Sequence, residues 1–194
     1  MNYSDKLREN VENSIETKKK FLSLSESIDL FGRATKAVVD AYRNGGRLYI
    51  AGNGGSAADA QHLAAEFVSK LAVSRAPLPA EALTVDTSII TAIANDYGYE
   101  EIFSRQVAGK MKSGDVFLGI TTSGNSSNIN HALRQCKKQG NLTIVFAGRD
   151  GGGAKDLADY CIIASGEHTA NIQELHIVLA HTLCEIVEYE MFAH

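Results

Sequence analysis

A histidine and a glutamate stand four residues apart just after a glycine-rich stretch of the chain. The stretch "GNGGSAADAQHLAAE" covers residues 52–66, and it places His62 and Glu66 one turn apart on the same face if the segment is helical. A carboxylate can act as a general base, and an imidazole together with a carboxylate can bind a divalent metal ion. The same spacing is also typical of a solvated surface pair, so it leaves both interpretations open.

A second candidate pair lies near the C-terminus. Gln173 and His181 fall on one ridge of a predicted helix whose neighbouring residues are apolar. A lone histidine in such a helix is more often a hydrogen-bonded core residue than a ligand. Gln173 and His181 are about 12 Å apart along a helix axis, so one small ligand can reach both only if their side chains converge or subunits meet there.

Two polar loops follow apolar segments of the sequence. In "AGNGGSAADA", Gly52, Gly54 and Gly55 let the backbone approach a ligand closely, and Asn53 and Ser56 add short polar side chains. The pattern is neither a dinucleotide-binding fingerprint nor a Walker loop, so a nucleotide is not indicated. A simple strand-to-helix turn with Ser56 as the N-cap is the more common explanation of a single glycine-rich turn.

The second loop, "TTSGNSSN", gathers hydroxyl groups at the start of a predicted helix. The hydroxyls belong to Thr121, Thr122, Ser123, Ser126 and Ser127. Hydroxyls and helix N–H groups together suit a phosphate dianion. An N-cap with a polar turn would use one or two of the five hydroxyls, so the loop favours a phosphate site.

These groups must be positioned by alternating strands and helices. The runs "RLYIAG", "DVFLGITTSGNSS" and "LTIVFAGRDGGG" each predict a strand, a turn and a helix. Two further apolar runs, "EALTV" and "YCIIA", bring the number of predicted strands to about five. The fold class is therefore α/β with a mostly parallel sheet, and ligands of such sheets bind beyond the carboxyl ends of the strands.

Long helices are predicted at both ends of the chain. Residues 1–45 predict two helices broken near residues 23–27, and "EHTANIQELHIVLAHTLCEIVEYEMF" predicts one helix with a broad apolar stripe. A five-stranded sheet cannot cover all this apolar surface, so we expect a helical oligomer interface. We expect a single domain over residues 1–194, with 1–45 contributing to the oligomer and 46–194 forming the sheet core and the C-terminal helix.

The composition excludes several classes of protein. The 194 residues are 44% hydrophobic and 22% charged, which is typical of a soluble globular protein, and the net charge of -4 provides no basic face for nucleic acid or a membrane surface. The three cysteines have the spacing of neither a disulfide framework nor a zinc knuckle. No apolar stretch approaches the roughly 18 residues of a membrane span. We expect a cytoplasmic protein with a small ligand.

Four stretches, in their order and spacing, resemble the bacterial phosphoheptose isomerases, a family with the sugar-isomerase (SIS) domain. They are "GNGGSAADAQHLAAEFVSK", "ANDYGYEEIFSRQV", "GDVFLGITTSGNSSN" and "IQELHIVLAH". The resemblance covers nearly the whole chain. It implies a flavodoxin-like, three-layer αβα sandwich with five parallel strands and extra N-terminal helices, assembled as a homotetramer with active sites between subunits. It also implies conversion of sedoheptulose 7-phosphate to D-glycero-D-manno-heptose 7-phosphate, the first step of ADP-heptose precursor synthesis for lipopolysaccharide core or other surface glycans.

The resemblance also implies roles for individual residues. One zinc ion per subunit would be held by His62, Glu66, Gln173 and His181, and Glu66 and His181 would form the acid-base pair. The implied substrate contacts are Asn53, Gly54, Gly55, Ser56, Glu66, Asn95, Asp96, Thr121, Thr122, Ser123, Ser126 and Gln173. The sequence departs from the family at Lys70, where an arginine is frequent, and a lysine lacks the bidentate fork.

The residue types leave two questions open. Ketose–aldose interconversion moves a proton between C1 and C2, and Glu66 suits the base, but the sequence does not decide whether it binds metal, abstracts the proton or does both. The alternative function is regulatory and non-catalytic. The sequence is also similar to a group of SIS-domain proteins that bind the bacterial replication initiator. That group has non-ionising residues at the positions of Glu66 and His181, so the presence of both favours the enzyme.

Overall fold

Five short apolar segments form one parallel sheet, as the sequence predicts. In the computed structural model, which describes residues 1–192, the strands are β1 (Leu48–Gly52), β2 (Ala80–Ala82), β3 (Val116–Thr121), β4 (Leu142–Gly148) and β5 (Tyr160–Ala164). Their order across the sheet is β2-β1-β3-β4-β5, and every pairing is parallel. This order is that of a flavodoxin-like doubly wound sheet, which confirms the predicted fold class.

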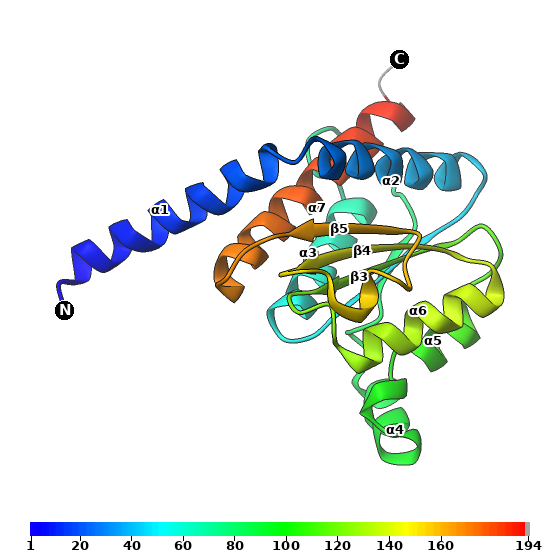
Figure 1. The fold of residues 1–194 in the computed structure, drawn as a ribbon. Helices are drawn as coiled ribbons and strands as arrows, with labels where there is room; N and C mark the ends of the chain where they lie inside the picture. Colours follow the sequence, from blue (N-terminus) through cyan, green and yellow to red (C-terminus); the bar gives the residue numbers. More distant parts are fainter. Residues whose placement is uncertain (193–194) are drawn as a thin grey trace.

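Helices cover both faces of the sheet (Figure 1). The α-helices are α1 (Tyr3–Leu22), α2 (Ser25–Arg43), α3 (Gly55–Val68), α4 (Thr87–Tyr97), α5 (Ser104–Lys110), α6 (Ser127–Gln139) and α7 (Thr169–Phe192), and the 3-10 turns are η1 (Tyr99–Glu101) and η2 (Gly152–Ala154). The break between α1 and α2 lies at residues 23–24, as predicted.

Alternate side chains of each strand pack into two separate cores. On β1 and β3, Ile50 and Leu118 face the core formed with α2, α3 and α7. Their strand neighbours Tyr49 and Phe117 face the core formed with α5 and α6. Because helices cover both faces, β1 and β3 are buried along their length, and their sequences are therefore almost continuously apolar. The result is the three-layer arrangement that the family resemblance implies.

The segment after β4 differs from the prediction. The sequence pattern predicts an α-helix after "LTIVFAG", but the chain forms only the 3-10 turn η2 there. Gly151 and Gly152 adopt positive φ angles of 90° and 47°, which an α-helix does not contain. A run of three glycines also has a poor helix propensity, so the connection to β5 stays short.

Helix α1 extends away from the body of the molecule (Figure 1). It carries several exposed apolar side chains. Tyr3, Leu7, Val11 and Ile15 recur every four residues and are all exposed. By contrast, the apolar residues of α2, such as Phe31 and Val38, are buried against the sheet. The apolar surface predicted in excess of what the sheet needs therefore lies mainly on α1. Within residues 1–192, no helix has the length and hydropathy needed to cross a membrane.

Candidate active site

Three of the predicted functional side chains meet between helices α3 and α7. His62 and Glu66 lie one turn apart on α3, with Nε2 and Oε1 3.1 Å apart. His181 on α7 places its ring edge to face with that of His62, with the centroids 5.1 Å apart. One donor atom from each of His62, Glu66 and His181 lies within 4.8 Å of the other two. His62 and Glu66 are therefore not an isolated surface pair, because the fold brings His181 to them as a third group.

The cluster has a composition that suits a metal ion. Two imidazoles and one carboxylate are ligands that Zn²⁺ takes in catalytic sites, which leave a coordination position for water or substrate. Only 21% of the Glu66 side chain is exposed, whereas 47% of the His62 side chain is exposed, so the site opens to solvent on the His62 side. The donor set of the cluster therefore fits the predicted ion.

Gln173, the fourth predicted ligand, lies at the beginning of the contact between α3 and α7. A Cβ at residue 55 would lie 2.4 Å from Nε2 of Gln173, so glycine lets this amide lie directly on the first turn of α3, and a larger residue would displace it. Gly55 begins α3 and lies seven residues before His62. Helices α3 and α7 therefore run side by side in the same direction, with Gln173 beside Gly55 and His181 beside His62.

The core histidine of helix α7 is His176. Its ring is buried, and Nε2 donates a hydrogen bond of 3.0 Å to the carbonyl of Ala147 at the end of β4. Burial lowers the pKa of His176 to about 4, and the hydrogen bond to Ala147 opposes this shift only in part. The description of a hydrogen-bonded core histidine, considered for His181 in the sequence, therefore fits His176 through Nε2, while its buried Nδ1 has no partner among residues 1–192.

The loop after β1 is tied to the start of α6. Asn53 and Asn128 exchange two amide hydrogen bonds of 2.9 and 2.8 Å, and the hydroxyl of Tyr99 donates to Oδ1 of Asn53 at 3.0 Å. Gly54, not Ser56, is the N-cap of α3, and its φ of 56° favours glycine. Ser56 is buried in the first turn, so its proposed capping role is wrong.

The loop after β3 turns tightly around Gly124. Its φ is 68°, and a Cβ there would lie 2.0 Å from the carbonyl oxygen of Gly151. Thr121 is buried, accepts a hydrogen bond from the N–H of Gly124 and pairs with the hydroxyl of Ser126 at 3.0 Å. Ser126 is the N-cap of α6 and makes no side-chain capping bond. The N–H of Ile129 donates to Oδ1 of Asn128 at 2.9 Å, so the N–H groups of Ser127 and Asn128 are the ones that the first turn can offer to an anion.

The remaining predicted contacts occupy different surroundings. Thr122 and Ser123 are half-buried in the loop after β3, and the hydroxyl of Ser123 accepts from the N–H of Asn125 at 3.1 Å. Asn95 and Asp96 are exposed near the end of α4 and bond to each other at 2.8 Å. Lys70 is exposed beyond the end of α3 at Val68.

Sequence reasoning missed three polar residues at this edge of the sheet. Asn128 and Tyr99 both hold the amide of Asn53, and each lies within a stretch on which the family resemblance rests. Asp59 lies one turn before His62, and burial raises the pKa of its carboxyl while His62 opposes the shift. Among residues 1–192, no hydrogen-bond partner reaches Oδ2 of Asp59. Of these three residues, only Asp59 has a signal in the sequence, because its i, i+3 spacing to His62 predicts a contact on a helix.

Comparisons with known proteins identify the family. The sequence model of the SIS domain matches residues 4–148. The phosphoheptose isomerase of Aneurinibacillus thermoaerophilus is 47% identical over 189 residues, which cover 97% of this chain and 96% of that protein. Phosphoheptose isomerase 2 of Campylobacter jejuni is 50% identical over 179 residues, which cover 92% of this chain and 89% of that protein.

A solved structure has the same fold over the whole chain. The phosphoheptose isomerase GmhA from Neisseria gonorrhoeae is 36% identical, with a TM-score of 0.90 and a coverage of 96% of this chain and 99% of that one. The alternative of a non-catalytic regulatory protein gains no support from these relatives. The chain belongs to the SIS domain family and, within it, to the phosphoheptose isomerases.

Proposed function

We propose that this chain converts sedoheptulose 7-phosphate to D-glycero-D-manno-heptose 7-phosphate. The observation that carries the proposal is the meeting of Glu66 with His62 and His181, because it joins a base to two groups that bind metal or transfer protons. The three relatives named above are called phosphoheptose isomerases, which supports the same reaction. The product would feed ADP-heptose synthesis for surface glycans, and we place the reaction in the cytoplasm.

Glu66 is the proposed base of the isomerisation. The reaction takes a proton from C1 of the ketose and returns one to C2, through an enediol that develops negative charge on the oxygens. Glu66 is the only carboxylate among the three clustered side chains, and its position on α3 directs it toward the His181 side chain of α7. We assign proton abstraction to Glu66 and proton donation at the substrate oxygen to His181.

His62, Glu66, Gln173 and His181 are the proposed ligands of one zinc ion per subunit. The zinc ion, when bound, would act as a Lewis acid on the substrate oxygens. The meeting of the donor atoms of His62, Glu66 and His181 supports three of these ligands. Gln173 lies beside Gly55, seven residues before His62 on α3, so it would join the ion only if its side chain turns toward the cluster or a second subunit supplies it. A neutral amide is also an uncommon zinc ligand, so the contribution of Gln173 is expected to be weak.

The loop after β3 is the proposed phosphate site. Thr122, Ser123 and Ser126 surround the first turn of α6, where N–H groups and the helix dipole favour an anion. Thr121 shapes the loop through its bonds to Gly124 and Ser126. The amides and backbone of Asn53, Gly54 and Gly55, with Ser56 behind them, would contact the sugar. Gln173, whose amide lies on Gly55, would also reach this part of the substrate.

The proposed assembly is a homotetramer whose subunits share active sites. Glu66 lies eleven residues, about 16 Å of helix, beyond Gly55, so Glu66 and the glycine loop of one chain are far apart for one substrate. A site completed by a second subunit removes this difficulty. The exposed row of Leu7, Val11 and Ile15 on α1 supplies apolar surface for the assembly. Asn95 and Asp96 would then reach the substrate bound to a neighbour.

The test is incubation of the purified protein with sedoheptulose 7-phosphate, followed by separation of the heptose phosphates. We expect the heptose product in the wild type and a loss of turnover after chelation that added zinc restores. Glu66→Gln serves as the inactive control, because glutamine has nearly the same size and cannot take the proton. Absence of product in zinc-loaded wild type would overturn the proposal. Full activity after chelation would exclude a catalytic role for the metal, and Glu66 and His181 would remain as the proposed acid-base pair.

A further inference from the structure

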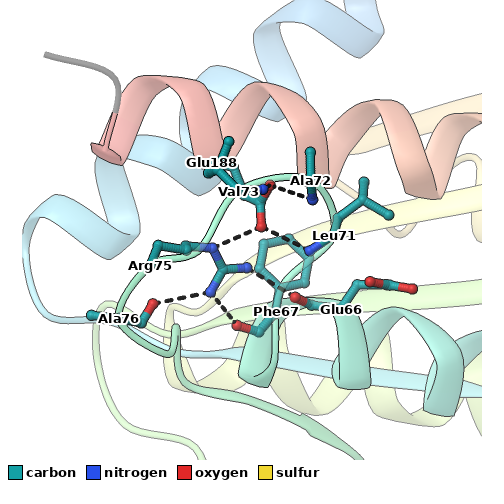
Figure 2. A network of polar contacts seen from close by, with 8 residues as sticks. All are labelled: Glu66, Phe67, Leu71, Ala72, Val73, Arg75, Ala76 and Glu188. Carbon is teal, nitrogen blue, oxygen red and sulfur yellow. Dashed lines mark hydrogen bonds and ion pairs between the residues drawn. The ribbon is translucent and has the colours of Figure 1, made fainter.

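A buried ion pair joins α7 to the segment that follows α3 (Figure 2). Nε of Arg75 lies 2.8 Å from Oε1 of Glu188, and the two side chains are only 1% and 3% exposed. Arg75 belongs to the connection between α3 and β2, and Glu188 belongs to the last two turns of α7. Neither residue belongs to a motif that predicts a function from the sequence.

The guanidinium of Arg75 holds the last turn of α3. Its Nη2 donates to the carbonyl of Glu66 at 2.9 Å, and Nη1 donates to the carbonyls of Phe67 at 2.8 Å and Ala76 at 3.0 Å (Figure 2). Because α3 ends at Val68, the carbonyls of Glu66 and Phe67 have no partner within the helix. Arg75 therefore supplies side-chain donors to the last carbonyls of α3, whose C-cap residue is Ser69, and its positive charge lies at the negative end of the helix dipole.

The carboxylate of Glu188 holds the segment that follows α3. It accepts hydrogen bonds from the N–H groups of Leu71 at 2.9 Å, Ala72 at 3.0 Å and Val73 at 3.4 Å, besides that from Arg75. Burial alone would raise the pKa of Glu188, but these hydrogen bonds keep it below its ordinary value, so the carboxylate is ionised. Glu188 thus fixes three successive residues of the chain to α7.

The ion pair lies next to both halves of the proposed active site. Glu66 is in the last turn of α3, and helix ends fray unless they are held. His181 is two turns before Glu188 on the same side of α7. One guanidinium thus bonds the backbone of Glu66 and the helix that carries His181. We propose that Arg75 and Glu188 are positioning residues that set the placement of Glu66 relative to His181.

A purely stabilising role is a poor explanation of this pair. Removing two charges from water costs free energy that their attraction repays only in part, and apolar residues of similar volume often stabilise a protein as well. What apolar residues cannot supply is a fixed geometry between two helices and a loop. A displacement of about 1 Å in an active site can lower the rate by about 100-fold, so a fixed geometry has catalytic value.

The inference rests on the proposed function, and two conservative variants test it. Arg75→Lys keeps the charge but has three donors and no planar fork, so it cannot replace the four hydrogen bonds of the guanidinium, and Glu188→Gln keeps the shape without the charge. Zinc affinity is measured by competition with a chelating dye. Steady-state kinetics with sedoheptulose 7-phosphate gives kcat and KM, and circular dichroism gives the fraction folded. We expect each variant to lower zinc affinity and kcat by about tenfold or more, with KM changed by less than about threefold.

Asp115→Asn is the matched control. Asp115 is also a buried carboxylate that accepts hydrogen bonds from backbone N–H groups, those of Arg47 at 2.9 Å and Lys112 at 2.7 Å. It directly precedes β3, so it lies at the amino-terminal ends of the strands, away from the proposed site. We expect this variant to lower the thermal midpoint while zinc affinity and kcat per folded molecule stay within about twofold of the wild type.

Two outcomes would overturn the positioning role. One is that Arg75→Lys and Glu188→Gln behave as Asp115→Asn does, with lower midpoints but unchanged zinc affinity and kcat. The other is that hydrogen exchange at the amides of residues 66–73 stays as slow in both variants as in the wild type, because the last turn of α3 would then not depend on the pair. If the wild type does not isomerise the sugar phosphate, the proposed function fails, while zinc affinity and hydrogen exchange still decide the role of the pair.

Discussion

The rings of His62 and His181 lie edge to face with their centroids 5.1 Å apart, although one residue belongs to the third helix and the other to the last. The contact exists because α3 and α7 run side by side in the same direction on one face of the sheet. Glu66 lies one turn beyond His62 and completes a group of three donors. A general base, a proton donor and a metal site can therefore share one narrow region between two helices.

Replacing Glu66 with glutamine is expected to lower kcat by at least about 100-fold, since positioned general bases contribute about 10² to 10⁴. Binding of sedoheptulose 7-phosphate should change little, because the amide keeps the size of the side chain. Steady-state kinetics of wild type and Glu66→Gln, with binding measured by calorimetry, checks both statements. Turnover close to that of the wild type would remove Glu66 from the chemistry.

His62→Ala and His181→Ala are expected to weaken zinc binding, because each removes one imidazole from the three-residue cluster. The measurement is zinc titration of chelated protein, with isomerase activity followed in parallel. His168→Ala is the control, because His168 is exposed just before α7 and outside the cluster. If neither cluster variant changes zinc uptake while activity survives chelation, His62 is structural and the acid-base pair works without metal.

The fold was largely predictable because each local signal agrees with the others. Apolar runs such as "DVFLGIT" are short, end in glycine or polar residues and recur between helical patterns, so strand positions and the parallel sheet follow from the sequence. The prediction failed after β4, where the apolar run is followed by glycines that adopt positive φ and prevent a helix. Local patterns predict the elements well, and failures arise where the backbone is unusual.

The site was only partly predictable from the residues. Spacing places His62 beside Glu66 on one helix, but the contact with His181 depends on how two distant helices pack, which no local pattern specifies. For the same reason, periodicity did not distinguish the buried His176 from His181 on α7. Arg75 and Glu188 look like surface charges in the sequence, because their partners are mostly backbone groups of a loop whose path the sequence does not reveal.

Replacing Ser123 and Ser126 together with alanine is expected to raise KM by about tenfold or more, with a smaller effect on kcat. A hydrogen bond to a charged group contributes about 1.5 to 3 kcal/mol, and these hydroxyls would meet the phosphate far from the reacting carbons. Inhibition by inorganic phosphate should weaken in parallel. Ser113→Ala is the control, because Ser113 is exposed before β3, at the amino-terminal ends of the strands and away from this loop. An unchanged KM would argue against phosphate binding at this loop.

Deletion of residues 1–22, which removes α1, is expected to dissociate the proposed tetramer and to lower activity. A gentler test replaces Leu7 and Val11 on the exposed apolar row with aspartate, and compares this variant with Arg8→Ser combined with Glu12→Ser on the adjoining face. Light scattering after size exclusion gives the mass of each protein. A fully active monomer at assay concentration would contradict both the assembly and the shared active site.

The buried His176 is expected to make the free energy of unfolding decrease below neutral pH. Its pKa is about 4 in the folded protein and 6.5 in the unfolded chain, chiefly because burial disfavours the charged ring. As the pH falls below 6.5, the unfolded chain binds a proton that the folded protein does not, so stability present above pH 6.5 is lost progressively down to about pH 4. The loss attributable to His176 is about 3 kcal/mol between pH 7 and pH 4.

His176→Gln tests this expectation, because glutamine can still donate to the carbonyl of Ala147 and does not titrate in this range. Urea unfolding of chelated protein at pH 7, 6, 5 and 4 gives the free energy at each pH. The variant should lose about 3 kcal/mol less than the wild type over this interval. His168→Gln, at an exposed position, is the control and should follow the wild type. Equal pH dependence in His176→Gln and the wild type would show that His176 does not cause the acid destabilisation.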